Sequence, residues 1–318
     1  CITGGAGTGK SFIISLMNYI CSYHEIPCYI LTPTGAAAKR LETLGLKAST
    51  IHRFLGYDSN ECTYNRGHQC KKGVYIVDES SMLSYSVMDM LLQALPSGSS
   101  AVFVGDPNQL PPVEIGRPFI DMVYSNSVEV FRLTDTFRQD VEAIDIVRAS
   151  EGVLKGNLRS LNMPNSKSFF LHIVEDKDSI VESIKEMLLQ QKESRSELRD
   201  VAFISEYMIM STTKYTGEAS VSKLNKMLAK TFNKESSHVA FKSSDGTQIR
   251  VYDIVMNVAN DYDRNVFNGD TGVVNYTQTG IQVYYTELKQ LENYDMYEVD
   301  NLELSYARSV HKSQGSEA

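Results

Sequence analysis

Eight consecutive residues near the start of the chain have the types and order needed to bind phosphate. They follow Cys1-Ile2-Thr3, which is typical of the end of a buried strand, and lead into Phe12–Met17, which has the apolar density of a helix packed on a sheet. Glycines let backbone N–H groups approach phosphate oxygens closely, and the N-terminus of the following helix favours an anion. A glycine-rich turn without function is the alternative, and the strand–loop–helix order disfavours it. We therefore expect nucleotide binding by Gly4, Gly5, Ala6, Gly7, Thr8, Gly9, Lys10 and Ser11.

Metal and water chemistry is expected from two carboxylates that directly follow an apolar run. Val74–Val77 predicts a buried strand, and Asp78 and Glu79 come next. Asp78 would hold Mg²⁺ through water, and the Ser11 hydroxyl would be another ligand of the same ion. Glu79 would orient and deprotonate the attacking water. Lys10 would hold the β- and γ-phosphates. A solvated acidic turn is the weaker alternative, because the apolar strand aims both carboxylates at the edge of the sheet where the loop lies.

Other polar residues stand at the carboxyl ends of predicted strands. Cys28–Thr32 predicts a second buried strand, and the repeat of strand, loop and helix predicts a parallel sheet. Thr34 and Gly35 follow this strand; a hydroxyl and free amides there could bind a phosphate, although the residue types fit a plain helix cap equally well. His52 lies at another predicted helix start, where residue type alone favours a structural role over a functional one.

Gln109 and Arg138 follow two further predicted strands, Ala101–Val104 and Val130–Leu133. Gln109 could sense the γ-phosphate as a neutral hydrogen-bonding group. Arg138 is a candidate for stabilising transition-state charge, whereas an arginine in isolation is more often part of a surface salt bridge.

The composition limits the class of protein. A length of 318 residues predicts about two domains, and no apolar run approaches the ~18 residues of a membrane span. The net charge is −8, but residues 1–74 carry eight Lys or Arg and four Asp or Glu, so a locally basic face could bind phosphate backbones.

Five scattered cysteines favour an intracellular, reducing compartment, such as the cytoplasm, the nucleus or a virus-infected cell. Cys62, His68 and Cys70 fit no standard zinc spacing and are interpreted as loop residues. Because the chain begins inside an apparent core strand, we expect a fragment of a longer protein.

The second half has a different pattern. Amphipathic spacing predicts helices at 144–154, 179–192 and 221–232, and residues 207–212 read as a strand. From residue 238 to 306, short runs of β-forming residues alternate with turn signals, which predicts a small barrel. The tyrosines of this region, among them Tyr276, Tyr284 and Tyr285, are interpreted as barrel core rather than as base-stacking residues.

Taken in order, these motifs resemble those of superfamily 1 helicases. The resemblance rests on residues 4–11, 32–41, 49–56, 77–82, 104–113, 137–139 and 304–317. Their order and residue sequences are similar to those of the RecD/Dda branch, whose members move 5′→3′ on single-stranded DNA. The implied fold is α/β, with two RecA-like P-loop domains whose parallel sheets are flanked by helices. The first would span residues 1–139, with a pin-like insertion at 57–72. The second would span 140–318, incomplete at its C-terminus, with an SH3-like β-barrel insertion at about 238–300.

The resemblance also implies roles that residue type leaves open. Gln109 would couple nucleotide state to DNA grip, and Arg138 would be an arginine finger. Gly315 and Glu317 would line the nucleotide cleft. Contacts to DNA would come from Thr34, Gly35, His52, His311, Lys312 and Ser313. The implied cofactors are ATP and Mg²⁺, and the implied partners are single-stranded DNA and junctions of single- and double-stranded DNA, with no membrane.

The expected function is an ATP-dependent DNA helicase that couples hydrolysis at the cleft between its domains to strand separation. One alternative is a nucleic-acid-binding P-loop module without productive motor activity, and another is a P-loop ATPase that acts on protein. The branch's upstream glutamine motif and its motif with a second arginine finger are not in this sequence. We therefore expect the fragment by itself to bind nucleotide and to hydrolyse it poorly.

Overall fold

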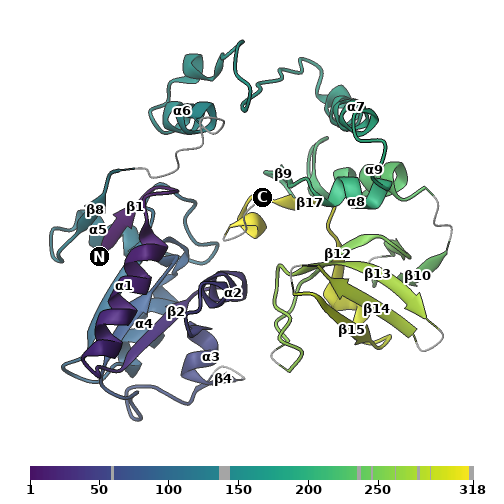
Figure 1. The fold of residues 1–318 in the computed structure, drawn as a ribbon. Coiled ribbons are helices and arrows are strands. Elements are labelled where there is room, and N and C mark those ends of the chain that lie inside the picture. The colour runs from purple at the N-terminus through teal and green to yellow at the C-terminus, as the bar shows by residue number, and fades with distance from the viewer. Residues whose placement is uncertain are drawn as a thin grey trace. The chain divides into compact units, whose positions relative to one another are not determined.

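The computed structural model describes residues 1–58, 61–135, 144–234, 238–244, 246–261, 263–277, 280–286 and 288–314. Arg138, Gly315 and Glu317 lie outside these residues, as does the predicted domain boundary between residues 139 and 140, which stays a prediction. The chain divides into two compact units, Cys1–His172 and Ile173–Ala318 (Figure 1). Across the described residues, no helix combines the length and the apolar character needed to span a membrane.

The first unit is built on a six-stranded parallel sheet with the order β3-β2-β6-β7-β1-β8. Its strands are β1 (Ile2–Gly4), β2 (Cys28–Thr32), β3 (Ala48–Thr50), β6 (Val74–Val77), β7 (Ser100–Gly105) and β8 (Phe131–Leu133). The helices are α1 (Lys10–Tyr23), α2 (Gly35–Thr43), α3 (Ile51–Leu55), α4 (Tyr85–Ala94), α5 (Pro118–Tyr124) and α6 (Ile144–Leu154). The expected α/β arrangement is confirmed for this unit.

Both faces of the sheet are buried, which explains why its strands read as continuous apolar runs. Successive residues of a strand point to opposite faces. Ile30 and Val104 belong to one hydrophobic cluster, together with Ile14 of α1, whereas their neighbours Leu31 and Phe103 belong to the other. Polar side chains that function chemically are therefore left to the loops at the strand ends.

A short hairpin lies within the polar stretch at 57–72. Strands β4 (Tyr57–Asp58) and β5 (Glu61–Cys62) pair antiparallel. A turn follows at Asn65, whose side-chain oxygen accepts hydrogen bonds from the amides of Gly67 (2.8 Å) and His68 (3.1 Å). The ring of Tyr64 stacks on Phe54 of α3, with centroids 6.1 Å apart, and attaches the insertion to the domain.

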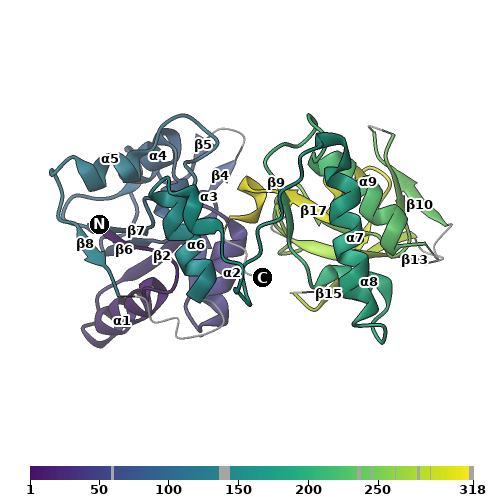
Figure 2. The same ribbon diagram turned by 90° about the horizontal axis from the view of Figure 1, so that it is seen from above.

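The second unit contains a small parallel sheet with helices beside it. Strand β9 (Ile209–Ser211) pairs in parallel with β17 (Ala307–Ser309), although nearly a hundred residues separate them in sequence. Helices α7 (Ile180–Glu193), α8 (Asp200–Ser205) and α9 (Val221–Phe232) lie side by side (Figures 1 and 2). The apolar stripe predicted on α9 is buried: Leu224 and Leu228 belong to one hydrophobic cluster with Phe203 of α8.

Between α9 and β17 the chain forms an antiparallel β structure with its own core. A five-stranded sheet has the order β15-β14-β13-β12-β16, and β10 pairs with β11. The bounds are β10 (Val239–Lys242), β11 (Gln248–Arg250), β12 (Ile254–Asn257), β13 (Thr271–Thr277), β14 (Gly280–Tyr285), β15 (Gln290–Tyr294) and β16 (Leu302–Leu304). Tyr285 is buried in this core, but Tyr276 and Tyr284 are exposed, so their interpretation as core residues is wrong. Tyr284 lies on the outer face because side chains alternate along β14, whereas Tyr276 is on the same face as Val274 but stands near the end of β13.

A buried carboxylate joins this β structure to the rest of the second unit. Asp253, which is fully buried just before β12, accepts hydrogen bonds from the side chains of Asn233 (2.7 Å) and Tyr306 (2.8 Å) and from the Arg250 amide (2.7 Å). Asn233 ends α9, and Tyr306 precedes β17. The network therefore fixes both connections of the β structure to its neighbours.

Candidate nucleotide-binding site

The loop between β1 and α1 is closed by hydrogen bonds from its own side chains. The Lys10 ammonium donates to the carbonyl oxygens of Gly4 (2.8 Å) and Gly5 (2.9 Å), and the Thr8 hydroxyl donates to that of Gly5 (2.9 Å). Gly9, directly before α1, has a φ of 88°, which glycine adopts without steric cost. The lysine head group thus lies over the loop backbone.

Gly4 stands where no side chain fits. A Cβ atom at this position would lie 2.3 Å from the Thr8 hydroxyl oxygen and 3.0 Å from Leu133 Cβ. By contrast, a Cβ atom on Gly5 would meet no protein atom within 4 Å. The first glycine of the loop is therefore required by packing within the protein itself.

Asp78 and Glu79 are buried at the carboxyl end of β6. Their exposed fractions are 1% and 5%. One Asp78 carboxylate oxygen accepts a hydrogen bond from the Glu79 amide (2.9 Å), whereas the other, Oδ2, is buried without a hydrogen-bond partner. Glu79 has a φ of 51°, a left-handed conformation that non-glycine residues rarely adopt. Such strain is typical of functional sites.

Burial governs the electrostatics of this pair. Desolvation raises the pKa of Asp78 above its ordinary value; the hydrogen bond from the Glu79 amide and the charges of Arg40 and Lys10 oppose that effect. Desolvation and then the neighbouring charge of Asp78 raise the pKa of Glu79, while Arg40 and Lys10 again act in the opposite direction. A carboxylate with a raised pKa is a stronger proton acceptor, as a catalytic base must be.

The donor set suits a magnesium ion that is shared with a nucleotide. Mg²⁺ is usually bound through one or two protein oxygens together with phosphates and waters. The unpartnered Oδ2 atom of Asp78 and the Ser11 hydroxyl provide such oxygens. Within the described parts of the chain, no group of three or more His, Cys, Asp or Glu side chains could hold a metal.

Gln109 is connected to the segment that follows Glu79. The Ser81 hydroxyl donates a hydrogen bond to the Gln109 side-chain oxygen (3.2 Å). Ser81 lies in a 3₁₀ turn, η1 (Ser80–Met82), directly after the carboxylate pair. Sequence reasoning missed this link, because 28 residues separate the two side chains.

Thr34, Gly35 and His52 lie at the carboxyl ends of the adjacent strands β2 and β3. The Thr34 hydroxyl accepts a hydrogen bond from the Ala37 amide (3.3 Å) and caps α2, so the helix-cap alternative describes its geometry. Gly35 is buried, and the half-buried His52 ring meets that of Tyr57 edge-on, with centroids 5.2 Å apart. The structure thus brings these residues to one edge of the sheet.

His311, Lys312 and Ser313 form a 3₁₀ turn, η6, in the second unit. His311 is exposed, while the buried Ser313 donates to the Ser309 carbonyl (3.2 Å). The Lys312 ammonium lies 3.8 Å from a carboxylate oxygen of Glu303, and burial lowers the pKa of this lysine.

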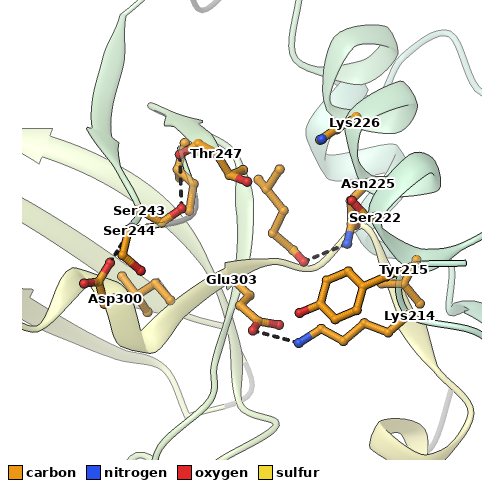
Figure 3. Close-up of a pocket in the computed structure, with 14 residues that line it drawn as sticks. Lys214, Tyr215, Ser222, Asn225, Lys226, Ser243, Ser244, Thr247, Asp300 and Glu303 are labelled. Carbon is orange, nitrogen blue, oxygen red and sulfur yellow. Dashed lines mark hydrogen bonds and ion pairs between the residues drawn. The ribbon is translucent and has the colours of Figure 1, made fainter.

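The same glutamate also lines a cavity of about 190 Å³ between α9, the β10–β11 pair and β16. The Lys214 ammonium, in the loop after β9, donates to Glu303 (2.9 Å), and Lys226 of α9 faces the cavity from another side (Figure 3). Glu303 therefore forms ion pairs with two lysines of the second unit, Lys214 and Lys312.

Comparison with known proteins defines the class. Residues 1–175 match the family described as an AAA domain, and the chain belongs to that family. Residues 224–285 match the SH3 domain of ATP-dependent RecD-like DNA helicases.

Individual relatives include a DNA helicase of the RecD2 type and RecD subunits of the RecBCD enzyme. The chain is 30% identical over 317 residues to the ATP-dependent RecD2 DNA helicase of Deinococcus radiodurans, covering 99% of this chain and 41% of that protein. It is 27% identical to the RecBCD enzyme subunit RecD of Mycolicibacterium smegmatis, covering 100% of this chain and 61% of that protein. The chain thus spans between about two fifths and three fifths of the length of these relatives. The resemblance to the RecD branch is confirmed.

Solved structures show the same fold. Bacteroides Pif1 bound to single-stranded DNA superposes with a TM-score of 0.55 at 18% identity, covering 99% of this chain and 79% of that chain. A second structure, of two Pif1 helicases at forked double-stranded DNA, gives 0.55 at 22% identity, covering 99% and 78%. The predicted fold, with RecA-like domains and an SH3-like insertion, is confirmed.

Proposed function

We propose that this chain is the motor region of an ATP-dependent DNA helicase that moves 5′→3′ on single-stranded DNA and acts at junctions with double-stranded DNA. The observation that carries the proposal is the buried, strained pair Asp78–Glu79 at the end of β6, in the same sheet as the phosphate-binding loop. The RecD-type relatives support the choice of DNA as the partner.

The loop and the carboxylates have complementary tasks in this proposal. Lys10 and the amides of residues 4–11 bind the phosphates of ATP. Ser11 and Asp78 hold Mg²⁺, which, when bound, offsets the charge of the phosphates and polarises the bond that breaks. Glu79 orients the attacking water and accepts its proton, a task for which its raised pKa suits it.

Other residues connect hydrolysis to the bound strand. Gln109 contacts the γ-phosphate and, through Ser81, the segment that carries Glu79. Arg138 supplies positive charge in the transition state, and Gly315 and Glu317 contact the nucleotide. The strand is contacted by Thr34, Gly35, His52, His311, Lys312 and Ser313.

We further propose that the boundary between two RecA-like domains lies between residues 139 and 140, and that the two domains bind DNA alternately. The hairpin at 57–72 acts as a pin that separates strands. Deleting this hairpin should impair unwinding more than ATP hydrolysis, and equal loss of both would argue against a pin.

The decisive experiment compares ATP hydrolysis with and without single-stranded DNA. DNA should stimulate the rate, and Glu79→Gln should lower it by about 10²–10⁴-fold while ADP affinity stays within about twofold of the wild type. Glu42→Gln, which makes the same change at an exposed glutamate of α2, is the matched control and should retain the rate. DNA binding without stimulated hydrolysis would favour the module without motor activity. A complete lack of DNA binding at low salt would favour an ATPase that acts on protein.

A further inference from the structure

Arg40 of α2 lies among the side chains that the proposed metal would use. One terminal guanidinium nitrogen is 3.4 Å from the Ser11 hydroxyl oxygen, 3.7 Å from Asp78 Oδ2 and 3.6 Å from Glu79 Oε1. The Arg40 side chain is 28% exposed, whereas those of the two carboxylates are almost completely buried. A single nitrogen atom thus approaches one oxygen of each residue, and none of these contacts is local in sequence.

The distances indicate a charge contact rather than a locked hydrogen-bonded pair. N–H···O hydrogen bonds are usually 2.7–3.2 Å long, and strong arginine–carboxylate pairs form two such bonds in parallel. The distances to Ser11, Asp78 and Glu79 are all longer than that. Its guanidinium can therefore leave without breaking a short bond to either carboxylate.

The carboxylates nevertheless require a positive charge close by. Two adjacent buried carboxylates repel each other, and burying them without a counter-charge is costly. The Lys10 ammonium donates to the carbonyl oxygens of Gly4 and Gly5. Arg40 approaches both carboxylates directly, and its charge acts on Asp78 and Glu79 more strongly than that of Lys10.

From this geometry we propose that Arg40 is a positioning residue that acts as an internal counter-cation and competes with Mg²⁺ for Ser11 and Asp78. The inference rests on the proposed function. Asp78 Oδ2, which accepts no hydrogen bond, is the oxygen assigned to the metal, and it is also the oxygen that Arg40 approaches. A guanidinium and a divalent cation in the same place repel, so Arg40 turns away when the metal enters and returns when it leaves. The arginine thereby weakens binding of the Mg²⁺·ADP product and favours its release.

Removing the charge of Arg40 tests the competition by a binding measurement that does not depend on turnover. The affinity for ADP is measured by titration calorimetry with Mg²⁺ and again with a chelator. Arg40→Met should tighten ADP binding in Mg²⁺ by roughly tenfold, which is within the range for charges about 4 Å apart near a protein surface. Binding in the chelator should stay within about twofold, because the ADP phosphates are assigned to Lys10 and the loop amides.

Further variants separate charge from shape and from folding. Arg40→Lys keeps the charge and should bind Mg²⁺·ADP like the wild type, whereas Arg40→Gln is a second neutral variant and should follow Arg40→Met. Lys47→Met removes a positive charge from the exposed surface of the same unit and should change neither affinity. Unchanged or weaker Mg²⁺·ADP binding by both neutral variants would overturn the competition, while the nucleotide site itself would stand. No ADP binding by the wild type would overturn the proposed function and this inference with it.

Discussion

Replacing Gly4 by alanine inserts a methyl group between parts of the protein that cannot all move away. The new Cβ atom would lie 2.3 Å from the Thr8 hydroxyl oxygen, 3.0 Å from Leu133 Cβ and 3.1 Å from the Leu133 carbonyl oxygen. Thr8 can rotate only by giving up its hydrogen bond to Gly5, and the carbonyl belongs to the backbone of β8. Overpacking of this kind costs about 1–3 kcal/mol, and the lost hydrogen bond adds about 0.5–1.5 kcal/mol.

We therefore expect Gly4→Ala to lower the free energy of unfolding of the first unit by about 2–4 kcal/mol. Gly5→Ala is the matched control and should change it by no more than about 0.5 kcal/mol, because nothing lies within 4 Å of the added atom. Hydrogen exchange at increasing urea concentration, measured peptide by peptide by mass spectrometry, reports the two units separately. The second unit should be unchanged and provides an internal reference.

A double-mutant cycle isolates the contact responsible. In a Thr8→Ala background the 2.3 Å contact no longer exists, while those with Leu133 remain, so the cost of Gly4→Ala should fall clearly. An undiminished cost in that background would refute the assignment to Thr8. Equal effects of Gly4→Ala and Gly5→Ala would refute the packing argument as a whole.

Three further predictions concern other parts of the chain. Tyr306→Phe should destabilise the second unit by about 1.5–3 kcal/mol, because the buried Asp253 carboxylate loses a hydrogen bond. Urea-dependent hydrogen exchange of peptides from the second unit measures this loss, and no change would mean that this hydrogen bond does not form in solution. Burial and the neighbouring Cys21 raise the pKa of Cys28 to about 12. Alkylation of this thiol at pH 8 should therefore be roughly a thousandfold slower in the folded protein than in urea, and it should accelerate as the pH rises. Equal rates in the folded and the urea-unfolded protein would contradict a buried Cys28. Ser81→Ala should reduce DNA-stimulated hydrolysis while ADP affinity stays unchanged, and full stimulation would exclude a coupling role for this hydroxyl.

Local patterns were sufficient for the elements that hold the site. The run Val74–Val77 predicts β6 to the residue, because a strand buried on both faces needs apolar side chains throughout. Helical spacing likewise predicts α9 with its observed bounds, Val221–Phe232. The order of glycines in the loop predicts close approach of the backbone to phosphate, whereas the structure shows that Gly4 is required by packing against Thr8 and Leu133.

Features that depend on tertiary packing could not be predicted in this way. The approach of Arg40 to Asp78 arises because the neighbouring Leu41 is packed into the core and leaves the arginine at the rim of the sheet. Strand β15 (Gln290–Tyr294) has little apolar character of its own and is held by pairing with β14. Propensity is weak for such strands, because cross-strand neighbours decide their conformation.

The five-stranded sheet of the second unit begins and ends in neighbouring strands. Strand β12 begins at Ile254, β16 ends at Leu304, and the two pair with Val255 opposite Leu304. The ends of this roughly fifty-residue segment are thus as close as paired strands allow, about 5 Å apart. A segment with adjacent ends behaves as a cassette, which recombination can exchange without disturbing the pairing of β9 with β17. A different sheet with the same spacing of its ends can therefore be grafted between Ile254 and Leu304.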